Sequence, residues 1–93
     1  MKFEWDDGKA ASNLAKHGVS FDEGLTAFDD PLAAIFDDEL HSAQESREIL
    51  IGYSSQDRLV LVCFVERSNR VRIISARLAT RRERDGYEKN AHR

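Results

Sequence analysis

The stretch Arg70-Val71-Arg72-Ile73-Ile74-Ser75-Ala76-Arg77 is the part of the sequence that decides the fold. Its β-branched residues predict a strand over residues 70–76. Because strand side chains alternate, Arg70 and Arg72 share one face, while Val71 and Ile73 point to the other. Such a strand has an apolar face for the core and a face that carries guanidinium groups, and this combination has two interpretations. It is a surface that meets an anionic ligand, or an edge strand whose charges oppose aggregation.

Two further strand patterns precede this stretch, over residues 47–53 and 59–66. The short polar segments between them predict turns, so the three strands form an antiparallel meander. The run 59–65 is apolar at every position, which is typical of a central strand covered on both faces. Weaker patterns predict two more strands, one at 32–36 and one at the start of the chain, where Phe3 and Trp5 face inward.

Three helices are predicted from their ends. The first helix begins at residues 6–7 and ends at Gly18. A capping-box pattern at 20–23 begins the second helix, which ends before Pro31. Another capping box, at 80–83, begins the third. The apolar face expected for the first helix consists of Ala11, Leu14 and Ala15. The predicted order is β-α-α-β-β-β-β-α, an α+β domain with a mostly antiparallel sheet packed by helices.

Length and composition limit the class of protein. The 93 residues predict a single domain, 1–93, with one modest core. The lone cysteine, Cys63, lies in an apolar run and is expected to be an inert core residue in a reducing compartment. The N-terminus has no long apolar segment and no stretch approaches membrane-spanning length, so we predict a cytoplasmic protein without a membrane partner.

The net charge is −3, but the acidic and basic residues are unevenly distributed along the chain. Residues 1–45 carry three lysines against eleven acidic residues, whereas residues 46–93 carry eleven basic residues, ten of them arginine, against six acidic ones. Arginine matters because its planar fork matches phosphate and carboxylate bidentately. The global charge argues against a nucleic-acid ligand and the arginine-rich half argues for one; we give more weight to the local distribution.

The sequence predicts no metal site and no cofactor. His17, His41 and His92 lie far apart and lack paired ligand spacing, and no glycine-rich phosphate loop is present. The side chains that remain as candidates for catalysis are basic residues and histidine imidazoles. RNA can be cut without metal if a base takes the 2′-hydroxyl proton and cations stabilise the charge that develops on the phosphate.

Each side chain suited to that chemistry also has a structural interpretation. His17 can satisfy a carbonyl at the end of its helix, and Lys9 can lie on an ordinary solvated helix face. Tyr87 can anchor the last helix to the core, and Arg77 can tie the 70–76 strand to the helix that follows. The residues alone leave both interpretations open.

Several motifs together resemble the BrnT family, and they cover nearly the whole chain in the right order. They are Phe3-Glu4-Trp5-Asp6, Asn13 with Lys16-His17-Gly18-Val19-Ser20-Phe21, Phe28-Asp29-Asp30-Pro31, Glu45-Ser46-Arg47, Arg72-Ile73-Ile74-Ser75-Ala76-Arg77, Glu83-Arg84 and Tyr87. The resemblance implies a RelE-like fold and a ribonuclease toxin of a type II toxin–antitoxin system that arrests translation. Family members are often basic, and this acidic chain departs from that pattern.

The resemblance also implies partners. These are an RNA substrate, a BrnA-like antitoxin with a DNA-binding domain, operator DNA reached only through that antitoxin, and a homodimer within the toxin–antitoxin complex. Our first hypothesis is therefore a metal-independent endoribonuclease. The second is a non-catalytic module that acts only through antitoxin binding and operon autoregulation. Direct DNA binding by this chain is disfavoured, because only its last helix offers a basic face.

For the ribonuclease hypothesis we assign roles to nine residues. His17 is the general acid or base, and Tyr87 positions or stacks on a base. Lys9, Arg67 and Arg77 bind the reacting phosphate. The residues expected to hold RNA outside the chemical step are Lys16, Arg58, Arg70 and Arg72.

Overall fold

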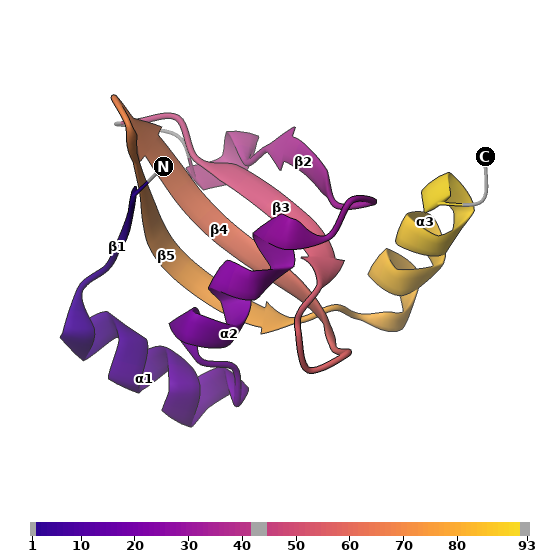
Figure 1. The fold of residues 1–93 in the computed structure, drawn as a ribbon, viewed down its shortest axis with the longest axis horizontal. Helices are drawn as coiled ribbons and strands as arrows, with labels where there is room; N and C mark the ends of the chain where they lie inside the picture. The colour runs from indigo at the N-terminus through magenta and orange to yellow at the C-terminus, as the bar shows by residue number, and fades with distance from the viewer. Residues whose placement is uncertain (1, 42–44, 92–93) are drawn as a thin grey trace.

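A five-stranded mixed sheet forms the centre of the computed structural model, which describes residues 2–41 and 45–91. Its strands are β1 (Lys2–Glu4), β2 (Ala34–Asp37), β3 (Glu48–Tyr53), β4 (Leu59–Arg67) and β5 (Arg70–Leu78). They lie in the order β1-β5-β4-β3-β2; β1 runs parallel to β5, and every other pair is antiparallel (Figure 1). The predicted α+β class, the meander and the central position of β4 are confirmed.

The helices begin and end at residues with suitable caps. They are α1 (Asp7–His17), α2 (Phe21–Thr26) and α3 (Arg81–Ala91), with short 3₁₀ helices η1 (Ala27–Asp29) and η2 (Glu39–His41) that the sequence did not predict. The Asp6 side chain accepts from the Lys9 amide at 2.9 Å, and Ser20 accepts from the Glu23 amide at 2.9 Å. Gly18 ends α1 in the left-handed region, with φ of 69°, which favours glycine.

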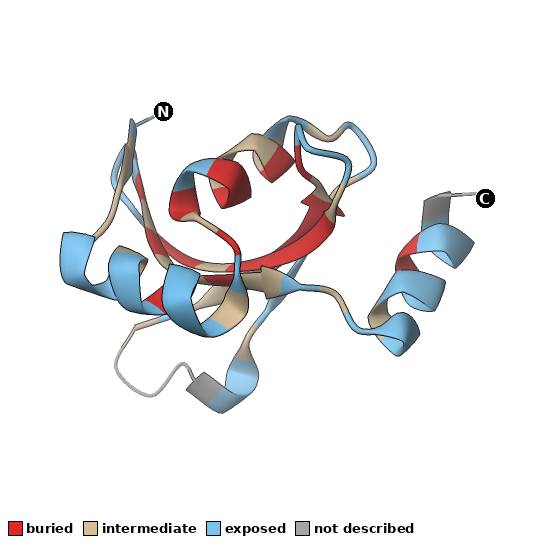
Figure 2. Ribbon diagram, turned by 90° about the horizontal axis from the view of Figure 1, so that it is seen from below, coloured by how far each residue is buried: buried red, intermediate tan, exposed pale blue. Residues whose placement is uncertain are grey.

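One face of the sheet holds the main core. α2 lies across this face, as Figure 2 shows, and buries Phe21 against it. The sheet residues that meet it include Leu50, Val62, Phe64 and Ile73, all of them buried. Each such side chain contributes roughly 1.5–3 kcal/mol when fully removed from water. The prediction that Val71 and Ile73 point away from the arginines and into the core is confirmed, because both are buried there.

The apolar face that we predicted for α1 is wrong. Ala11, Leu14 and Ala15 are exposed, with Leu14 at 51%. The helix does not lie over the core; it lies beside the sheet, level with its edge (Figure 2). An amphipathic pattern therefore does not describe how this helix is attached.

A buried asparagine attaches α1 to β5. The Asn13 amide nitrogen donates to the carbonyl oxygens of Val19, at 2.9 Å, and Ala76, at 2.8 Å, and its Oδ1 accepts from the Ala76 amide at 3.1 Å. β1 pairs with β5 only over residues 70–72, so Ala76 lies at a part of the edge that β1 does not reach. Asn13 supplies the backbone partners that a longer β1 would have supplied.

The opposite face of the sheet is set by an irregularity in β5. Cys63 of β4 pairs with Ser75, but the next residue, Phe64, pairs with Ile73, so Ile74 is an extra residue in β5. Paired residues point to the same side. Arg72 pairs with Val65, Ser75 with Cys63 and Arg77 with Leu61, and these three β4 residues alternate on one face. We call this face, which carries Arg72, Ser75 and Arg77, the open face.

At one end, α3 covers the open face through a single aromatic anchor. Tyr87 packs with Ile51, Leu59 and Leu61, and its ring meets the Tyr53 ring edge-on at 5.5 Å. The predicted capping box of α3 is confirmed, since Thr80 and Glu83 exchange side-chain and backbone hydrogen bonds of 2.8 and 3.2 Å. Among the residues that the structure describes, none of the helices is both long and apolar enough to cross a membrane.

Candidate functional site

Two hollows meet on the open face at the irregularity in β5. The first lies between β5 and α1 and is lined by Lys9, Lys16 and His17. The second lies over β3 and β4 and is lined by Arg77 together with Asp38, Leu40, Arg47, Ile49, Leu61 and Cys63. Ile74 and Ser75 line both hollows, so they form one continuous surface, which we call the bulge groove.

The sequence explains why α1 presents its cations here. Lys16 and His17 occupy the last turn of α1, where positive side chains interact favourably with the helix dipole. Lys9 lies about two turns earlier, so all three line the same hollow. Asn13 fixes this helix to the backbone of Ala76, two residues after the extra residue Ile74. The attachment of α1 and the shape of the groove therefore depend on the same part of β5.

Arg77 is the cation that β5 itself contributes. Its guanidinium donates to both carboxylate oxygens of Glu83, at 2.8 and 2.9 Å, and to the carbonyl oxygen of Leu78 at 3.1 Å. The Glu83 hydrogen bond raises the pKa of Arg77, and the same pairing lowers the pKa of Glu83 to about 2. Arg77 thus lines the groove and also ties β5 to α3, so both of its predicted roles fit its position.

Cys63 lies within the groove, although we predicted an inert core residue. Its exposure is intermediate, and its Sγ lies 3.9 Å from Oδ2 of Asp38. Burial, followed by the negative charge of Asp38, raises the pKa of the thiol. The thiol is therefore protonated at neutral pH, which makes it a poor nucleophile and leaves the prediction of chemical inertness intact.

The structure places Tyr87 outside the groove. Its side chain is buried, with 7% of the residue exposed, and its hydroxyl donates to Oδ2 of Asp30 at 2.6 Å. Burial and this hydrogen bond raise the pKa of Tyr87, while Asp30 also accepts from the backbone amides of Tyr53 and Leu32, at 2.8 and 2.9 Å. The position fits the core anchor among the two interpretations of Tyr87.

Arg58 is likewise occupied elsewhere. It forms an ion pair with Glu23, whose side chain is only 2% exposed, and donates to the carbonyl oxygen of Gly18 at 3.0 Å. Ser54 donates to the same carboxylate at 2.7 Å. The Arg58 hydrogen bond lowers the pKa of Glu23 despite its burial. This arginine compensates a buried charge that α2 brings into the protein.

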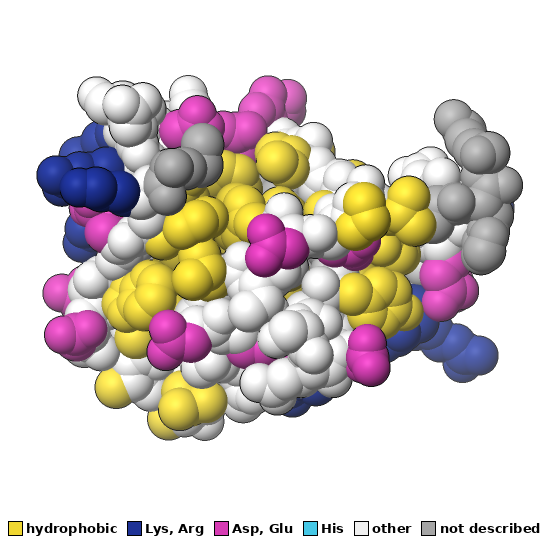
Figure 3. Space-filling view, viewed as in Figure 1, with side chains coloured by type: hydrophobic (Ala, Val, Ile, Leu, Met, Phe, Trp, Pro, Cys, Tyr) yellow, Lys and Arg dark blue, Asp and Glu magenta, His cyan; other side chains and the backbone are white. Residues whose placement is uncertain are grey.

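Three of the predicted arginines lie at the other end of β5, by the β4–β5 hairpin. Arg67 is paired with Glu45, and Arg70 and Arg72 are paired with Glu4 at 3.3 and 3.1 Å. Lys and Arg side chains gather at this end of the sheet in Figure 3. The structure therefore separates the candidate residues into a groove group, a hairpin group and two residues that hold other elements.

Two contributors to the groove were missed by sequence reasoning. Ser75 lines both hollows, and Asn13 holds α1 in place. A signal for the first was present, since the consecutive apolar residues Ile73 and Ile74 interrupt the alternation of the strand. Asn13 belongs to one of the family motifs, but the helical pattern gave no sign of its role, because a polar residue in an amphipathic helix is ordinarily expected to be exposed.

The groove shows no cluster of metal ligands among the residues described. There, no three His, Cys, Asp or Glu side chains lie together in a way that could hold an ion. Of the three histidines considered from the sequence, the side chains of His41 and His92 fall outside the described part of the chain. What the groove offers is an imidazole, several cations and an apolar floor that includes Ile49 and Leu61.

An α+β fold whose open face carries imidazole and cationic groups beside an apolar floor defines a protein suited to an anionic, base-bearing ligand. The chain belongs to the BrnT family, the ribonuclease toxins of type II toxin–antitoxin systems, whose family model matches residues 5–83. Membership implies RNA as substrate and an antitoxin as partner.

A solved structure is similar over most of the chain. It is the crystal structure of the Brucella abortus ribonuclease toxin BrnT, with 26% sequence identity and a TM-score of 0.67. The match covers 87% of this chain and 99% of the other. A search of curated proteins finds no match. The recognition of the family from sequence motifs is confirmed.

Proposed function

We propose that this protein is a metal-independent endoribonuclease toxin that inhibits translation, and that the bulge groove is its active site. The observation that carries the proposal is the meeting of the two hollows at Ile74 and Ser75. That meeting brings His17 and Lys9 of α1 onto one surface with Arg77 of β5. These groups supply acid–base and charge-stabilising functions from a helix and a strand held together by Asn13.

The roles follow from the chemistry of phosphodiester cleavage. His17 takes the proton of the 2′-hydroxyl and the 2′-oxygen attacks phosphorus. The bond from phosphorus to the 5′-oxygen breaks as that oxygen takes a proton from water. The products are a 2′,3′-cyclic phosphate and a 5′-hydroxyl. Lys9 and Arg77 stabilise the negative charge that grows on the phosphate oxygens. Bases are accommodated on the apolar floor of the groove, while Lys16 and Arg72 hold flanking phosphates.

Arg77 must exchange partners to act in this way. Its guanidinium is paired with Glu83, so a substrate phosphate competes with that carboxylate or binds the remaining donors. The acidic composition of the chain is consistent with this balance, because carboxylates such as Glu83 limit the positive field of the groove. Tyr87 and Arg58 are given no chemical role here, since their side chains hold Asp30 and Glu23.

A BrnA-like antitoxin is proposed as the partner. Large apolar side chains are exposed on and beside β2, at Leu32, Ile35, Phe36 and Leu40, and such groups favour a protein-binding surface. Operator DNA is reached only through the antitoxin, in a complex that contains a toxin homodimer. The α+β sheet supports a RelE-like relationship. We propose a cytoplasmic location because the RNA of translation, the proposed substrate, is found there.

The test is RNA cleavage by the purified protein in a chelator. We expect wild-type protein to cut RNA in EDTA and to leave cyclic-phosphate ends. His17→Gln should lower kcat by roughly 10²–10⁴-fold, the usual contribution of a general acid or base. Lys9→Met should reduce kcat less strongly. Tyr87→Phe is the matched control and should leave kcat unchanged in the folded protein, because its hydroxyl meets Asp30 and not the groove.

The competing hypothesis is a non-catalytic module that acts only by binding its antitoxin. The exposed apolar side chains around β2 favour such binding whether or not the groove is catalytic. Folded wild-type protein that neither cuts RNA in EDTA nor stops growth without antitoxin would overturn our proposal and support this alternative. Cleavage that disappears in EDTA and returns with a divalent cation would overturn metal independence alone.

A further inference from the structure

A row of like charges crosses three strands at the hairpin end of the open face. Arg70 of β5 lies opposite Lys2 of β1 on one side and opposite Arg67 of β4 on the other. Paired residues point to the same face, so three cationic side chains project side by side. We call Lys2, Arg70 and Arg67 the cation row. Like charges placed directly opposite each other across strands are destabilising.

The carboxylates near the cation row compensate it only in part. Glu4 pairs with both Arg70 and Arg72, and Glu45 pairs with Arg67, so within the described part of the chain two paired acids face four cations, Lys2 included. Arg70 and Arg67 are 65% and 66% exposed in these pairs. Exposed ion pairs of this kind contribute roughly 0–1 kcal/mol, so a ligand oxygen can replace either carboxylate at little cost.

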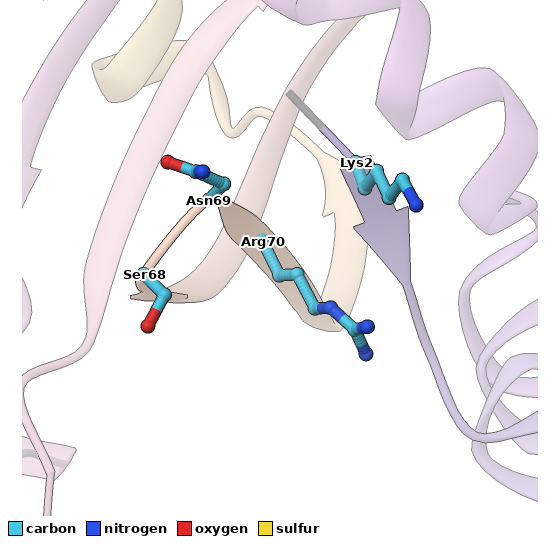
Figure 4. A pocket seen from close by; sticks show the side chains of 4 residues that line it. All are labelled: Lys2, Ser68, Asn69 and Arg70. Atoms are coloured by element: carbon cyan, nitrogen blue, oxygen red, sulfur yellow. The ribbon is translucent and has the colours of Figure 1, made fainter.

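The turn beside the row adds neutral donors. Figure 4 shows the hollow that Lys2, Ser68, Asn69 and Arg70 line at the tip of the hairpin. The turn residues Ser68 and Asn69 thus line the same hollow as Lys2 and Arg70, although the Asn69 amide points away from the two cations in Figure 4. The Lys2 amide donates to the Asn69 carbonyl oxygen at 3.1 Å, which fixes β1 against the turn. Donors of both kinds are common at sites that contact sugar and phosphate.

We propose that the cation row binds the sugar–phosphate backbone of the RNA substrate, outside the bulge groove. The inference rests on the proposed function for its ligand, RNA. Arg70 and Arg72 share the open face with Ser75 and Arg77, and β5 rises roughly 3.3 Å per residue. A single strand lying along β5 therefore reaches the cation row about 15 Å from the irregularity at Ile74–Ser75.

This arrangement favours RNA over an acidic protein segment. From the row, Arg70, Arg72 and Arg77 lie in order along β5 and lead into the groove, as a phosphate backbone would. Among the described residues, the exposed large apolar side chains lie outside the three residues of the row, and most are on and beside β2, where a protein segment would gain more from burial. Binding by the row should therefore depend on salt and on RNA length, and not on sequence.

The experiment measures binding of a 2′-O-methyl RNA, which cannot be cleaved, at several salt concentrations. For single strands the slope of log K against log salt changes by roughly 0.7 for each phosphate that the protein neutralises. Arg70→Ala should therefore weaken binding and flatten the slope by about that amount. Glu4→Gln should do the opposite and tighten binding, because it removes the carboxylate that competes for Arg70 and Arg72.

Arg82→Ala on α3 is the matched control, since it removes an exposed arginine from a different element. Affinity and slope for Arg70→Ala that equal those of Arg82→Ala would overturn the inference. So would an Arg70→Ala protein that binds RNA normally but loses affinity for the antitoxin, because the row would then be a protein-binding site.

Cleavage kinetics separate this inference from the proposed function. For an RNA too short to reach the hairpin, Arg70→Ala should leave kcat/KM unchanged, whereas for a longer RNA it should raise KM and spare kcat. A loss of kcat on the short RNA would contradict the inference. Failure of wild-type protein to cut any RNA would overturn the proposed function, while the binding of uncleavable RNA would still decide the role of the row.

Discussion

Two arginine–glutamate pairs at opposite ends of the protein look alike in sequence and differ in structure. Arg58 meets Glu23, whose carboxylate is almost fully buried and also accepts a hydrogen bond from Ser54. Arg70 shares Glu4 with Arg72, and both partners are open to solvent. The burial of the carboxylate therefore distinguishes an arginine that holds the fold from one that is available to a ligand.

The physical reason is the difference in the free-energy cost of removing the arginine partner from each carboxylate. Glu23 cannot regain water when its partner is removed, so Arg58 is needed wherever the protein is folded. Glu4 is 36% exposed and regains water easily. A phosphate can thus displace Glu4 from Arg70 at little cost, whereas displacing Glu23 from Arg58 would disrupt the attachment of α2 to the loop that follows β3.

The largest expected effect comes from breaking the buried pair. Arg58→Ala should lower the free energy of unfolding at neutral pH by more than the roughly 0–1 kcal/mol of an exposed pair, because it leaves the buried Glu23 charge uncompensated. Urea denaturation measures the decrease. RNA cleavage per folded molecule should be unchanged, since Arg58 lies outside the bulge groove.

A second substitution checks the cause of that decrease. Adding Glu23→Gln to Arg58→Ala should restore part of the stability, because the buried charge disappears with its partner. Equal stability of the single and double variants would show that packing of the arginine stem, and not charge, accounts for the effect. A decrease under about 1 kcal/mol for Arg58→Ala would remove the contrast between the two pairs.

An intermediate effect is expected at Arg77, where the carboxylate is partly exposed. Pairing lowers the pKa of Glu83 from 4.5 to about 2, so its stabilisation is present above pH 4.5 and is lost as the pH falls toward about 2. Glu83→Gln should cost about 1 kcal/mol at neutral pH. The difference in Tm from wild type should shrink over that acidic interval; a difference that does not change with pH would contradict the ion-pair explanation.

Much of the fold could be predicted because local signals agree with it. The caps at Asp6, Ser20 and Thr80 and the apolar run of β4 place helices and the central strand correctly. The attachment of α1 was not predicted, because the expected apolar face is exposed and a buried asparagine holds the helix to the sheet edge. Hydrophobic periodicity cannot detect a helix that is attached by backbone hydrogen bonds.

The sequence predicted which kinds of side chain form the candidate site, but not which of those side chains lie together. Arginines that look equivalent in the sequence go to the groove, the hairpin or a buried pair, depending on which carboxylate lies nearby. Glu83 is six positions from Arg77, but the other carboxylates are remote in sequence: Glu23 is 35 positions from Arg58, and Glu4 is 66 from Arg70. The extra residue Ile74 also determines which arginines share a face. Pairing across such distances is tertiary information.

The smallest effect is the most informative about the hairpin end. Arg70→Ala should change the free energy of unfolding by less than about 0.5 kcal/mol, and its sign should be stabilising. The substitution removes a weak exposed pair with Glu4 but also the repulsion from Lys2 and Arg67 that lie opposite it. High salt should reduce the gain, because screening weakens the same repulsion in wild-type protein. Urea denaturation at low and high salt measures it, and a decrease above about 1 kcal/mol at either salt would mean that Arg70 holds the sheet together as Arg58 holds α2.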